Sequence, residues 1–181
     1  MSNPVLKEEH MDSIHWPEKY LPGTTDNYCC NEVIVQGLKI QDAWPYLIKA
    51  PCWTQYYHNS ADIKFDNQDG PYLYDGCKFF FRTFGFPIDA KVTEFLPSDG
   101  NGSTARISWH GWNEDPENRL DVIHAWLFQE LSGNRLRILT QESQIGKPAI
   151  ELATKKPNAM INGHQDWLDG IVKAAKEKLK I

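Results

Sequence analysis

The sequence predicts an α+β fold in which a curved antiparallel sheet of about seven strands wraps around one long C-terminal helix. Residues 61–145 consist mainly of short runs that alternate between apolar and polar side chains and are separated by turn residues, the pattern of an antiparallel meander. Residues 162–181 instead repeat apolar side chains at helical spacing. A single sheet with an apolar face needs a cover, and this last segment is long enough to provide it.

The length and composition favour one globular domain. The chain has 181 residues, of which 41% are hydrophobic and 12% aromatic. This is enough to build a core in one domain of ordinary size. We expect residues 27–181 to form this domain and residues 1–26 to form an irregular N-terminal arm, because Pro4, Pro17 and Pro22 interrupt the arm.

Charge and hydropathy argue against two classes of partner. The net charge of −5 lacks the basic footprint of a nucleic-acid-binding protein. No run of about 18 apolar residues is present in the sequence, so we expect no membrane span. The N-terminus lacks the apolar region of a signal peptide, and the cysteines form no C-x-x-C pair. We therefore expect a cytoplasmic protein with reduced thiols.

One strand and two short helices are expected before the meander. Residues 27–35 are rich in strand-favouring side chains. Residues 38–57 repeat apolar side chains at helical spacing. Asp42 is the expected cap of the first helix, which leaves Pro45 in the first turn, where its missing N–H does little harm. A second short helix is expected at residues 52–57.

Six further strands are expected at regular spacing. Turn signals at residues 68–71, 98–102 and 132–133 separate several of them, and Pro87 is expected to separate two more. The expected strands are residues 61–66, 76–84, 88–96, 104–112, 120–131 and 134–145.

The last segment is expected to form a long amphipathic helix. Asn162 is the expected N-cap, with Gln165 three residues later as its capping-box partner. Gly170 lies within the helix, where it costs ~1 kcal/mol relative to Ala. We therefore expect a neighbouring element to approach the backbone closely at that point. The apolar face contains Trp167, Leu168, Ile171, Val172, Ala175 and Leu179.

Three groups of residues resemble a known superfamily. They are Ala-Trp-Pro-Tyr-Leu at 43–47 followed by Trp53, the closing hairpin of residues 125–128 and 137–142, and the Trp-Leu pair that begins at Trp167. In this order they resemble the START-like (SRPBCC) superfamily, the helix-grip fold of the birch pollen allergen relatives and of the polyketide cyclase/dehydrase and lipid-transport proteins. The resemblance covers residues 27–181. It implies a hydrophobic cavity between sheet and helix that binds lipids, hormones or polyketides, and in some members catalysis.

Strand alternation predicts which side chains would line such a cavity, because charged residues such as Arg106 and Arg137 should face water and their neighbours should face inward. For residues 120–131 both faces are apolar, and we favour the face of His124 and Trp126 as the inward one because Trp126 belongs to the resemblance. If the inward rings pack against one another, the same residues form a solid aromatic core instead. The candidate pocket residues are Phe79, Phe81, Trp109, His124, Trp126, Phe128, Thr140, Glu142, Trp167 and Ile171.

His124 and Glu142 are the candidate catalytic pair. If both face the cavity, the carboxylate can orient the imidazole, which can then transfer a proton in a cyclisation or dehydration. The alternative is structural, with both side chains hydrogen-bonded inside the core. Glu94 is a weaker candidate. Because His164 is isolated in the sequence and no spacing of His or Cys suits zinc, we expect no metal and no cofactor.

Three functions follow, in order of preference. The first is binding or transport of a small hydrophobic ligand, such as a lipid, a polyketide or an aromatic compound, in the internal cavity. The second is a cyclase- or dehydratase-type enzyme that uses His124 and Glu142. The third is a protein-interaction module of the co-chaperone type, which requires an exposed apolar patch rather than an enclosed pocket.

Overall fold

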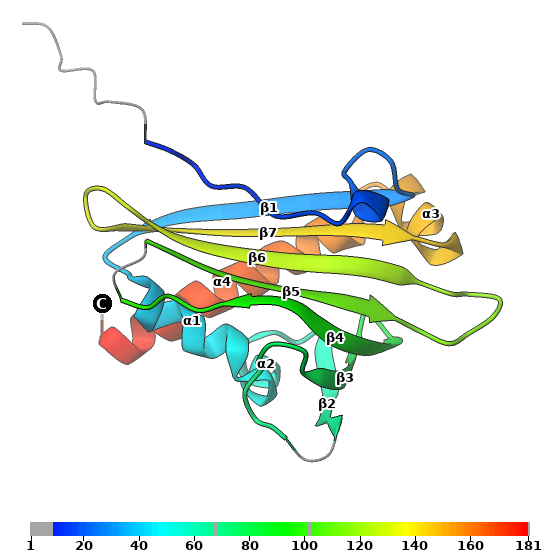
Figure 1. Cartoon of the computed structure of the whole chain (residues 1–181), viewed down its shortest axis with the longest axis horizontal. Helices are drawn as coiled ribbons and strands as arrows, with labels where there is room; N and C mark the ends of the chain where they lie inside the picture. The colour runs from blue at the N-terminus through cyan, green and yellow to red at the C-terminus, as the bar shows by residue number, and fades with distance from the viewer. Residues whose placement is uncertain (1–8, 67–68, 101–102, 181) are drawn as a thin grey trace, which may run out of the picture.

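The fold is a seven-stranded antiparallel sheet that curves around a long C-terminal helix, as predicted (Figure 1). The computed structural model describes residues 9–66, 69–100 and 103–180. The strand order is β1-β7-β6-β5-β4-β3-β2, a meander in which β1 pairs with the last strand. The strands are β1 (Asn27–Gln36), β2 (Ser60–Phe65), β3 (Lys78–Thr83), β4 (Phe86–Leu96), β5 (Thr104–Trp112), β6 (Asp121–Leu131) and β7 (Arg135–Ile145).

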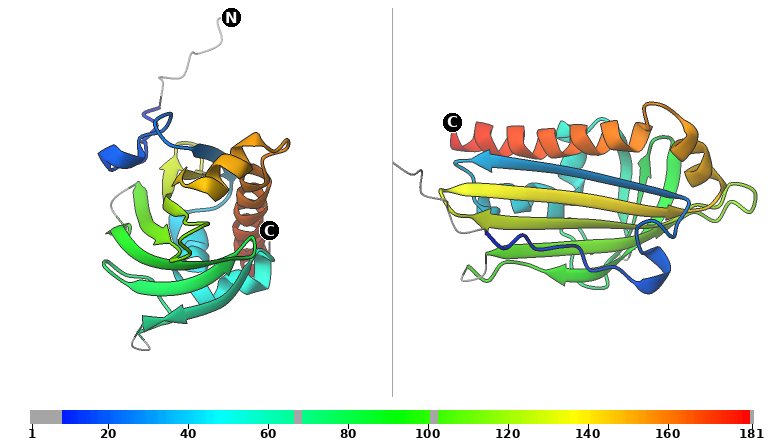
Figure 2. Two further views of the ribbon diagram at one scale, coloured as in Figure 1. Left: turned by 90° about the vertical axis from the view of Figure 1, so that its right-hand side faces the viewer. Right: turned by 90° about the horizontal axis from the view of Figure 1, so that it is seen from above.

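The helices lie on the concave side of this sheet, with α4 running alongside β1 (Figure 2). Helices α1 and α2 pack against α4 and so fill the space between α4 and the far strands. The α-helices are α1 (Ile40–Ile48), α2 (Trp53–Tyr56), α3 (Lys147–Thr154) and α4 (Ala159–Leu179); two 3₁₀ turns are η1 (Glu18–Tyr20) and η2 (Ala50–Cys52). No helix within the described residues has the length and apolar character needed to span a bilayer.

Both predicted helix caps are wrong by a few residues. Helix α1 begins at Ile40, and the carboxylate of Asp42 instead accepts a hydrogen bond of 2.9 Å from the Lys39 N–H within its first turn. Helix α4 begins after Asn158, whose Oδ1 accepts from the Met160 N–H at 3.0 Å. In both cases the helix starts one turn before the polar residue that the sequence pattern singled out, because a carboxylate or amide can also serve inside the first turn.

The turn between β3 and β4 also differs from the prediction. Pro87 lies within β4, opposite Arg82, rather than between two strands. Pairing of β4 with β5 begins only at Asp89, so the missing N–H of Pro87 faces no second strand. The two-residue turn is formed by Phe84 and Gly85, both with positive φ, of 50° and 81°. A bulky aromatic residue rarely adopts this conformation, so its neighbours must hold Phe84 in place.

Aromatic side chains fill the space between the sheet and α4. The Trp53 ring lies at the centre, with centroid distances of 4.9 Å to Trp167 and 5.8 Å to Trp109. Trp167 in turn stacks on Tyr57 at 4.5 Å and meets Trp126 edge-on at 5.1 Å. All five side chains are at most 1% exposed. The rings therefore contact one another rather than surround a large void.

Residues 9–26 of the N-terminal arm lie against the outer face of the sheet. Ile14 packs against Ala125 and Leu127 of β6, so this face points away from α4 and the face of His124 and Trp126 points inward, as favoured. Arg106 and Arg137, expected to face water, are instead nearly buried, and they donate hydrogen bonds to arm carbonyl groups at 2.6 and 2.8 Å.

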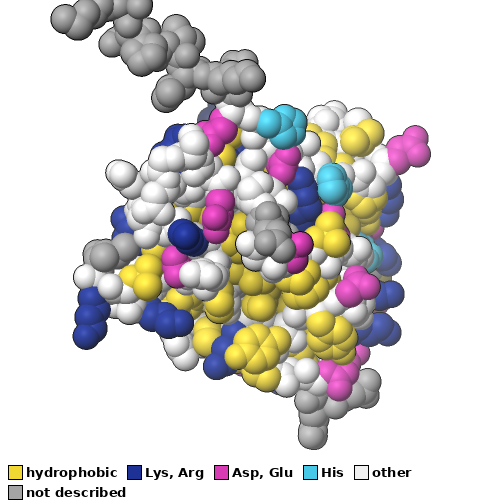
Figure 3. Space-filling model, turned by 60° about the vertical axis from the view of Figure 1, so that its left-hand side comes forward, with side chains coloured by type: hydrophobic (Ala, Val, Ile, Leu, Met, Phe, Trp, Pro, Cys, Tyr) yellow, Lys and Arg dark blue, Asp and Glu magenta, His cyan; other side chains and the backbone are white. Residues whose placement is uncertain are grey.

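Exposed apolar side chains are spread over many elements. Figure 3 shows one face on which apolar side chains gather near the middle, with acidic and basic side chains around them. Among the described residues, the exposed large hydrophobic side chains are Met11, Leu21, Tyr28, Ile34, Tyr72, Tyr74, Leu96, Ile150, Ile161 and Leu179. They come from the arm, β1, the β2–β3 connection, β4, α3 and α4, so no single element presents a continuous apolar stripe. The exposed apolar side chains thus gather on the face in Figure 3 without following one helix or strand, and the protein-interaction hypothesis stays a prediction.

Asp121 fastens the arm to the edge of β6. Its carboxylate accepts hydrogen bonds from Lys19 Nζ at 2.7 Å and Tyr20 Oη at 2.6 Å, and contacts His110 Nε2 at 2.6 Å. Burial alone would raise the pKa of Asp121, but these three partners outweigh it and lower the pKa to about 2.

Replacing Asp121 by Asn is expected to lower the free energy of unfolding by about 1.5–3 kcal/mol at neutral pH, the usual range for a hydrogen bond to a charged group. Because the pKa of Asp121 in the folded protein is depressed, this stabilisation is complete above the ordinary carboxyl value near 4 and is lost as the pH falls toward about 2. Chemical denaturation from pH 7 to pH 2 should therefore show the difference between the two proteins shrinking. A constant difference would contradict the role of the carboxylate charge.

Gly170 allows α2 to contact α4, as the sequence predicted. A Cβ atom at Gly170 would lie 2.6 Å from the carbonyl oxygen of Tyr56. Replacing Gly170 by Ala is therefore expected to destabilise the fold by about 1–3 kcal/mol, although Ala is the better helix former. Gly163 provides the matched control on the same helix, because its added Cβ would meet the ring of Phe84, a side chain that can move. Equal thermal denaturation losses for the two variants would contradict this explanation.

Candidate functional site

Three buried titratable side chains meet between the sheet and α4, and we call them the His–Glu–His cluster: His124, Glu142 and His164. His124 of β6 and Glu142 of β7 are direct partners in the antiparallel register, so their side chains emerge on the same face. Helix α4 brings His164 to them from the other side. The three residues are 2%, 6% and 1% exposed.

The carboxylate of Glu142 lies between the two imidazoles. Its Oε2 atom is 3.0 Å from Nδ1 of His124 and 3.4 Å from Nε2 of His164. The two imidazole rings stack with their centroids 4.5 Å apart and their planes 23° from parallel. One carboxylate oxygen therefore serves both rings.

Each member of the cluster also contacts one residue outside the cluster. Nε2 of His124 lies 2.8 Å from Oγ1 of Thr140, and Nδ1 of His164 lies 3.3 Å from the sulfur of Cys29. Oε1 of Glu142 accepts a hydrogen bond from the side-chain amide of Gln144. These contacts fix the orientation of both rings and of the carboxylate.

A line of amide side chains connects the carboxylate to the start of α4. Gln144 donates to Glu142 and accepts from Nδ2 of Asn27 at 2.6 Å. Oδ1 of Asn27 accepts from Nδ2 of Asn158 at 3.0 Å. Asn158 is also the N-cap of α4. The amide orientations are thus set by one another, from the helix cap to Glu142.

Burial and neighbouring groups shift the pKa values of the three cluster residues in different directions. For all three groups burial disfavours the charged form. For His124 burial has the largest effect, and it lowers the pKa below the ordinary value. For Glu142 the two imidazoles outweigh burial and lower the pKa of the carboxyl. For His164 the Cys29 sulfur and the Glu142 carboxylate outweigh burial and raise the pKa. The cluster therefore favours a negative Glu142 beside a positive His164 and a neutral His124.

A small cavity of about 30 Å³ lies beside the cluster, a volume that suits roughly one water molecule. Three half-buried residues, Thr83, Phe84 and Phe86, mark the mouth where the lining reaches the surface. Phe84 packs beside Leu152 and Met160 and lies over Gly163 of α4. The lining comprises Phe81, Thr83, Phe84, Phe86, Ile88, Trp109, Leu120, Val122, His124, Glu142, Gln144, Leu152, Met160, His164 and Trp167.

The predicted pocket residues divide into two groups. Five of them line the cavity: Phe81, Trp109, His124, Glu142 and Trp167. The others lie in or behind the packed core: Phe79 against Trp53, Phe128 against Trp44, Trp126 against Trp167, Ile171 within the core, and Thr140 bonded to His124. The weaker candidate Glu94 is not part of this site. Its carboxylate lies 2.6 Å from Nδ1 of His15, at the outer face of the sheet.

Sequence reasoning missed His164, Cys29 and Gln144. His164 does not stand alone as expected, because its ring stacks on that of His124. A signal was present: His164 precedes Trp167, Leu168 and Ile171 by three, four and seven residues, which places it on the buried face of the helix. Gln144 lies two residues after Glu142 on β7 and so shares its face. Cys29 gave no signal beyond its position on an expected strand.

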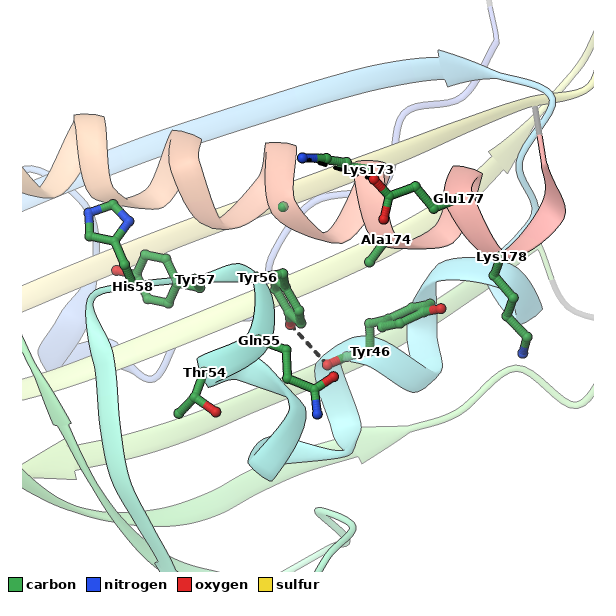
Figure 4. A pocket seen from close by; sticks show the side chains of 11 residues that line it. Tyr46, Thr54, Gln55, Tyr56, Tyr57, His58, Lys173, Ala174, Glu177 and Lys178 are labelled. Atoms are coloured by element: carbon green, nitrogen blue, oxygen red, sulfur yellow. Dashed lines mark hydrogen bonds and ion pairs between the residues drawn. The ribbon is translucent and has the colours of Figure 1, made fainter.

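A larger groove lies on the outside of the molecule, between α2 and α4 (Figure 4). It has a volume of about 590 Å³ and is open to solvent. Tyr56 closes its floor by donating to the carbonyl of Tyr46 at 2.9 Å. Its charged pair, Lys173 and Glu177, is 77% and 68% exposed. Because these two charges are solvated and pair with each other at 3.9 Å, the inner cavity is the stronger candidate site.

Comparisons with known proteins place the chain in a family. No protein-family model matches the sequence, and no curated protein matches it. The crystal structure of hypothetical protein jhp0584 from Helicobacter pylori matches with a TM-score of 0.88 and 47% identity, over 93% of this chain and 99% of that one. The chain belongs to the jhp0584 family.

More distant matches to this jhp0584-family chain show the fold alone. One is the di-domain ARO/CYC protein StfQ from the steffimycin biosynthetic pathway, with a TM-score of 0.63, 13% identity, and coverage of 86% of this chain and 54% of that one. Another is norcoclaurine synthase from Thalictrum flavum, a point mutant in complex with a transition state analogue, with a TM-score of 0.57, 11% identity, and coverage of 84% and 95%. The helix-grip arrangement is thus shared with proteins of very different sequence.

Replacing Glu142 by Gln is expected to lower the free energy of unfolding by about 3–5 kcal/mol, because it removes one partner of a buried ion pair and leaves the other uncompensated. Thr140→Val is the matched control, since it removes one neutral hydrogen-bond partner of His124 and should cost about 1–3 kcal/mol. Both are measured by urea denaturation with a chelator present. A Glu142→Gln loss no larger than that of Thr140→Val would contradict a charged Glu142 in the folded protein.

Proposed function

We propose that this chain binds a small, largely apolar molecule in the inner cavity, with a polar group of that molecule directed at the His–Glu–His cluster. The observation that carries the proposal is the convergence of three buried titratable side chains on an apolar-walled cavity. Ligand sites in proteins combine apolar walls with a few well-placed polar groups in this way. Buried groups with strongly shifted pKa values are also concentrated at functional sites.

The volume limits the class of ligand. The cavity of about 30 Å³ is far smaller than the several hundred Å³ that drug-sized ligands occupy. The aromatic rings around Trp53 fill the region where a long lipid would otherwise lie. A ligand therefore enters by displacing side chains at the mouth, and it is a compact molecule rather than a long-chain lipid.

Phe84 is the side chain that would move. It is half-buried, it has a positive φ that its residue type disfavours, and it packs against Met160, an adaptable side chain. Backbone strain of this kind is concentrated at ligand clamps and switch regions. The norcoclaurine synthase of the same fold was solved with a transition state analogue bound, so the fold accommodates a small molecule.

Binding is supported better than proton transfer by His124. Nδ1 of His124 faces Glu142 and Nε2 faces Thr140, so both ring nitrogens are occupied within the protein. A general acid or base needs a nitrogen within hydrogen-bond reach of its substrate. A cyclase-type reaction, as the name of StfQ would suggest, would require a substrate that displaces one of these partners.

Phenol and 2-naphthol are suitable probes, because each combines an aromatic body with one hydroxyl group. Both are expected to shift the indole N–H signals of Trp109 and Trp167 in NMR titrations, since these side chains line the cavity. Phe84→Ala should tighten binding by about tenfold, corresponding to ~1.4 kcal/mol of displacement cost removed, with the larger gain for 2-naphthol.

Phe80→Ala is the matched control for this experiment. Phe80 lies on the same strand as Phe81 but does not line the cavity, and Lys64 covers its ring. This variant should leave the affinities unchanged. Failure of both probes to bind to the natural protein and to Phe84→Ala would overturn the proposed function.

A further inference from the structure

We propose that Nδ1 of His124, Nε2 of His164 and Oε2 of Glu142 bind one divalent transition-metal ion. This inference goes beyond ligand binding in the cavity and does not depend on it. The sequence predicted no metal because the three residues lie far apart along the chain. The fold brings their three ligand atoms within 4.8 Å of one another.

The spacing of the ligand atoms fits a metal ion. Imidazole nitrogens and carboxylate oxygens bind zinc at about 2.0–2.2 Å, which sets two ligand atoms of one ion roughly 3.0–3.5 Å apart. Oε2 of Glu142 lies 3.0 Å from the His124 nitrogen and 3.4 Å from the His164 nitrogen. Both separations fall in this range, so a modest rotation of the rings would complete the site.

The contacts around the two imidazoles leave one nitrogen of each ring facing Glu142. Oγ1 of Thr140 lies 2.8 Å from Nε2 of His124, and the Cys29 sulfur lies 3.3 Å from Nδ1 of His164. The nitrogens that face the carboxylate are therefore Nδ1 of His124 and Nε2 of His164, at 3.0 and 3.4 Å. A metal ion at that point would replace any proton on these two nitrogens, because metal ligands must be deprotonated.

The residues behind the cluster also match a metal site. Metal-bound histidines almost always donate their second ring N–H to another group, and metal-bound carboxylates are themselves hydrogen-bonded. Here Thr140 contacts the second ring nitrogen of His124, and the Cys29 sulfur contacts that of His164. Gln144 donates a hydrogen bond to the second oxygen of Glu142. Each proposed ligand thus has its outer partner already in place.

The donor set indicates the class of metal. Imidazole ligands suit zinc, iron, copper and nickel, whereas calcium and magnesium prefer oxygen ligands alone. Two histidines and one carboxylate bind zinc in hydrolases and iron(II) in oxygenases, in each case with a position left open. The cavity of about 30 Å³ beside the cluster has room for roughly one water molecule at that position.

The test is a Zn²⁺ titration of chelator-treated protein by calorimetry, with metal content measured after gel filtration. The natural protein should bind one ion per chain. His164→Ala should weaken binding by more than about a hundredfold, and Thr140→Val by about ten- to a hundredfold, the range for loss of an outer partner. The exposed His58 and the surface pair of His15 and Glu94 provide controls, so His58→Ala and His15→Ala should bind as the natural protein does.

Binding no tighter in the natural protein than in His164→Ala would overturn the proposal, as would loss of the ion in His15→Ala. If His164→Ala does not fold, the Co²⁺ spectrum of the natural protein decides. Ligand-field bands without thiolate-to-cobalt charge transfer support the proposed ligands. A charge-transfer band would place a cysteine sulfur among the ligands and overturn the set, and a spectrum equal to that of aqueous Co²⁺ would overturn the site. If the protein binds phenol but not Zn²⁺, only the metal site is overturned. If it binds Zn²⁺ but neither aromatic probe, only the proposed function is overturned.

Discussion

The carboxylate of Glu142, withdrawn from water between two imidazoles, is the constraint on which much of this structure depends. A buried charge is tolerated only where opposite charge and hydrogen bonds compensate it. His124 reaches the carboxylate through the register of β6 and β7, but His164 reaches it only if α4 lies at one particular height and rotation on the sheet. The pairing of strands and the seating of the helix are therefore tied together by one polar contact inside an otherwise apolar interior.

The aromatic residues have the complementary role. Rings stacked between the sheet and α4, with Trp53 and Trp167 at the centre, leave little free space in the middle of the molecule. What space remains lies at the end where α4 begins, next to the charged groups. A fold that the resemblance associates with large hydrophobic ligands is thus filled here by the protein's own side chains, and the site is displaced toward the helix N-terminus.

Sequence reasoning succeeded where local patterns determine the structure. The seven strands follow from alternation and turn residues, and the close approach at Gly170 follows from a glycine that helix propensity does not explain. It failed where distant segments decide. Arg106 and Arg137 look like solvent-facing residues until the arm lies over them, and helix α3, Lys147–Thr154, is too short to predict without its partners. The pairing of His124 with Glu142 could be anticipated from facing strands. The contribution of His164 depends on how α4 sits on the sheet, which no local pattern specifies.

The amide line from Asn158 through Asn27 and Gln144 to Glu142 has a consequence for variation within this family. The segment that joins α3 to α4 looks like an ordinary surface connection, where insertions and deletions are usually tolerated. Here Asn158, which ends this segment, is linked through Asn27 and Gln144 to Glu142 and so helps to set the orientation of that carboxylate toward the two imidazoles. A change in the length of the connection would therefore rotate the carboxylate. Relatives that keep the two histidines and the glutamate should therefore also keep the length of this connection and an amide at its end.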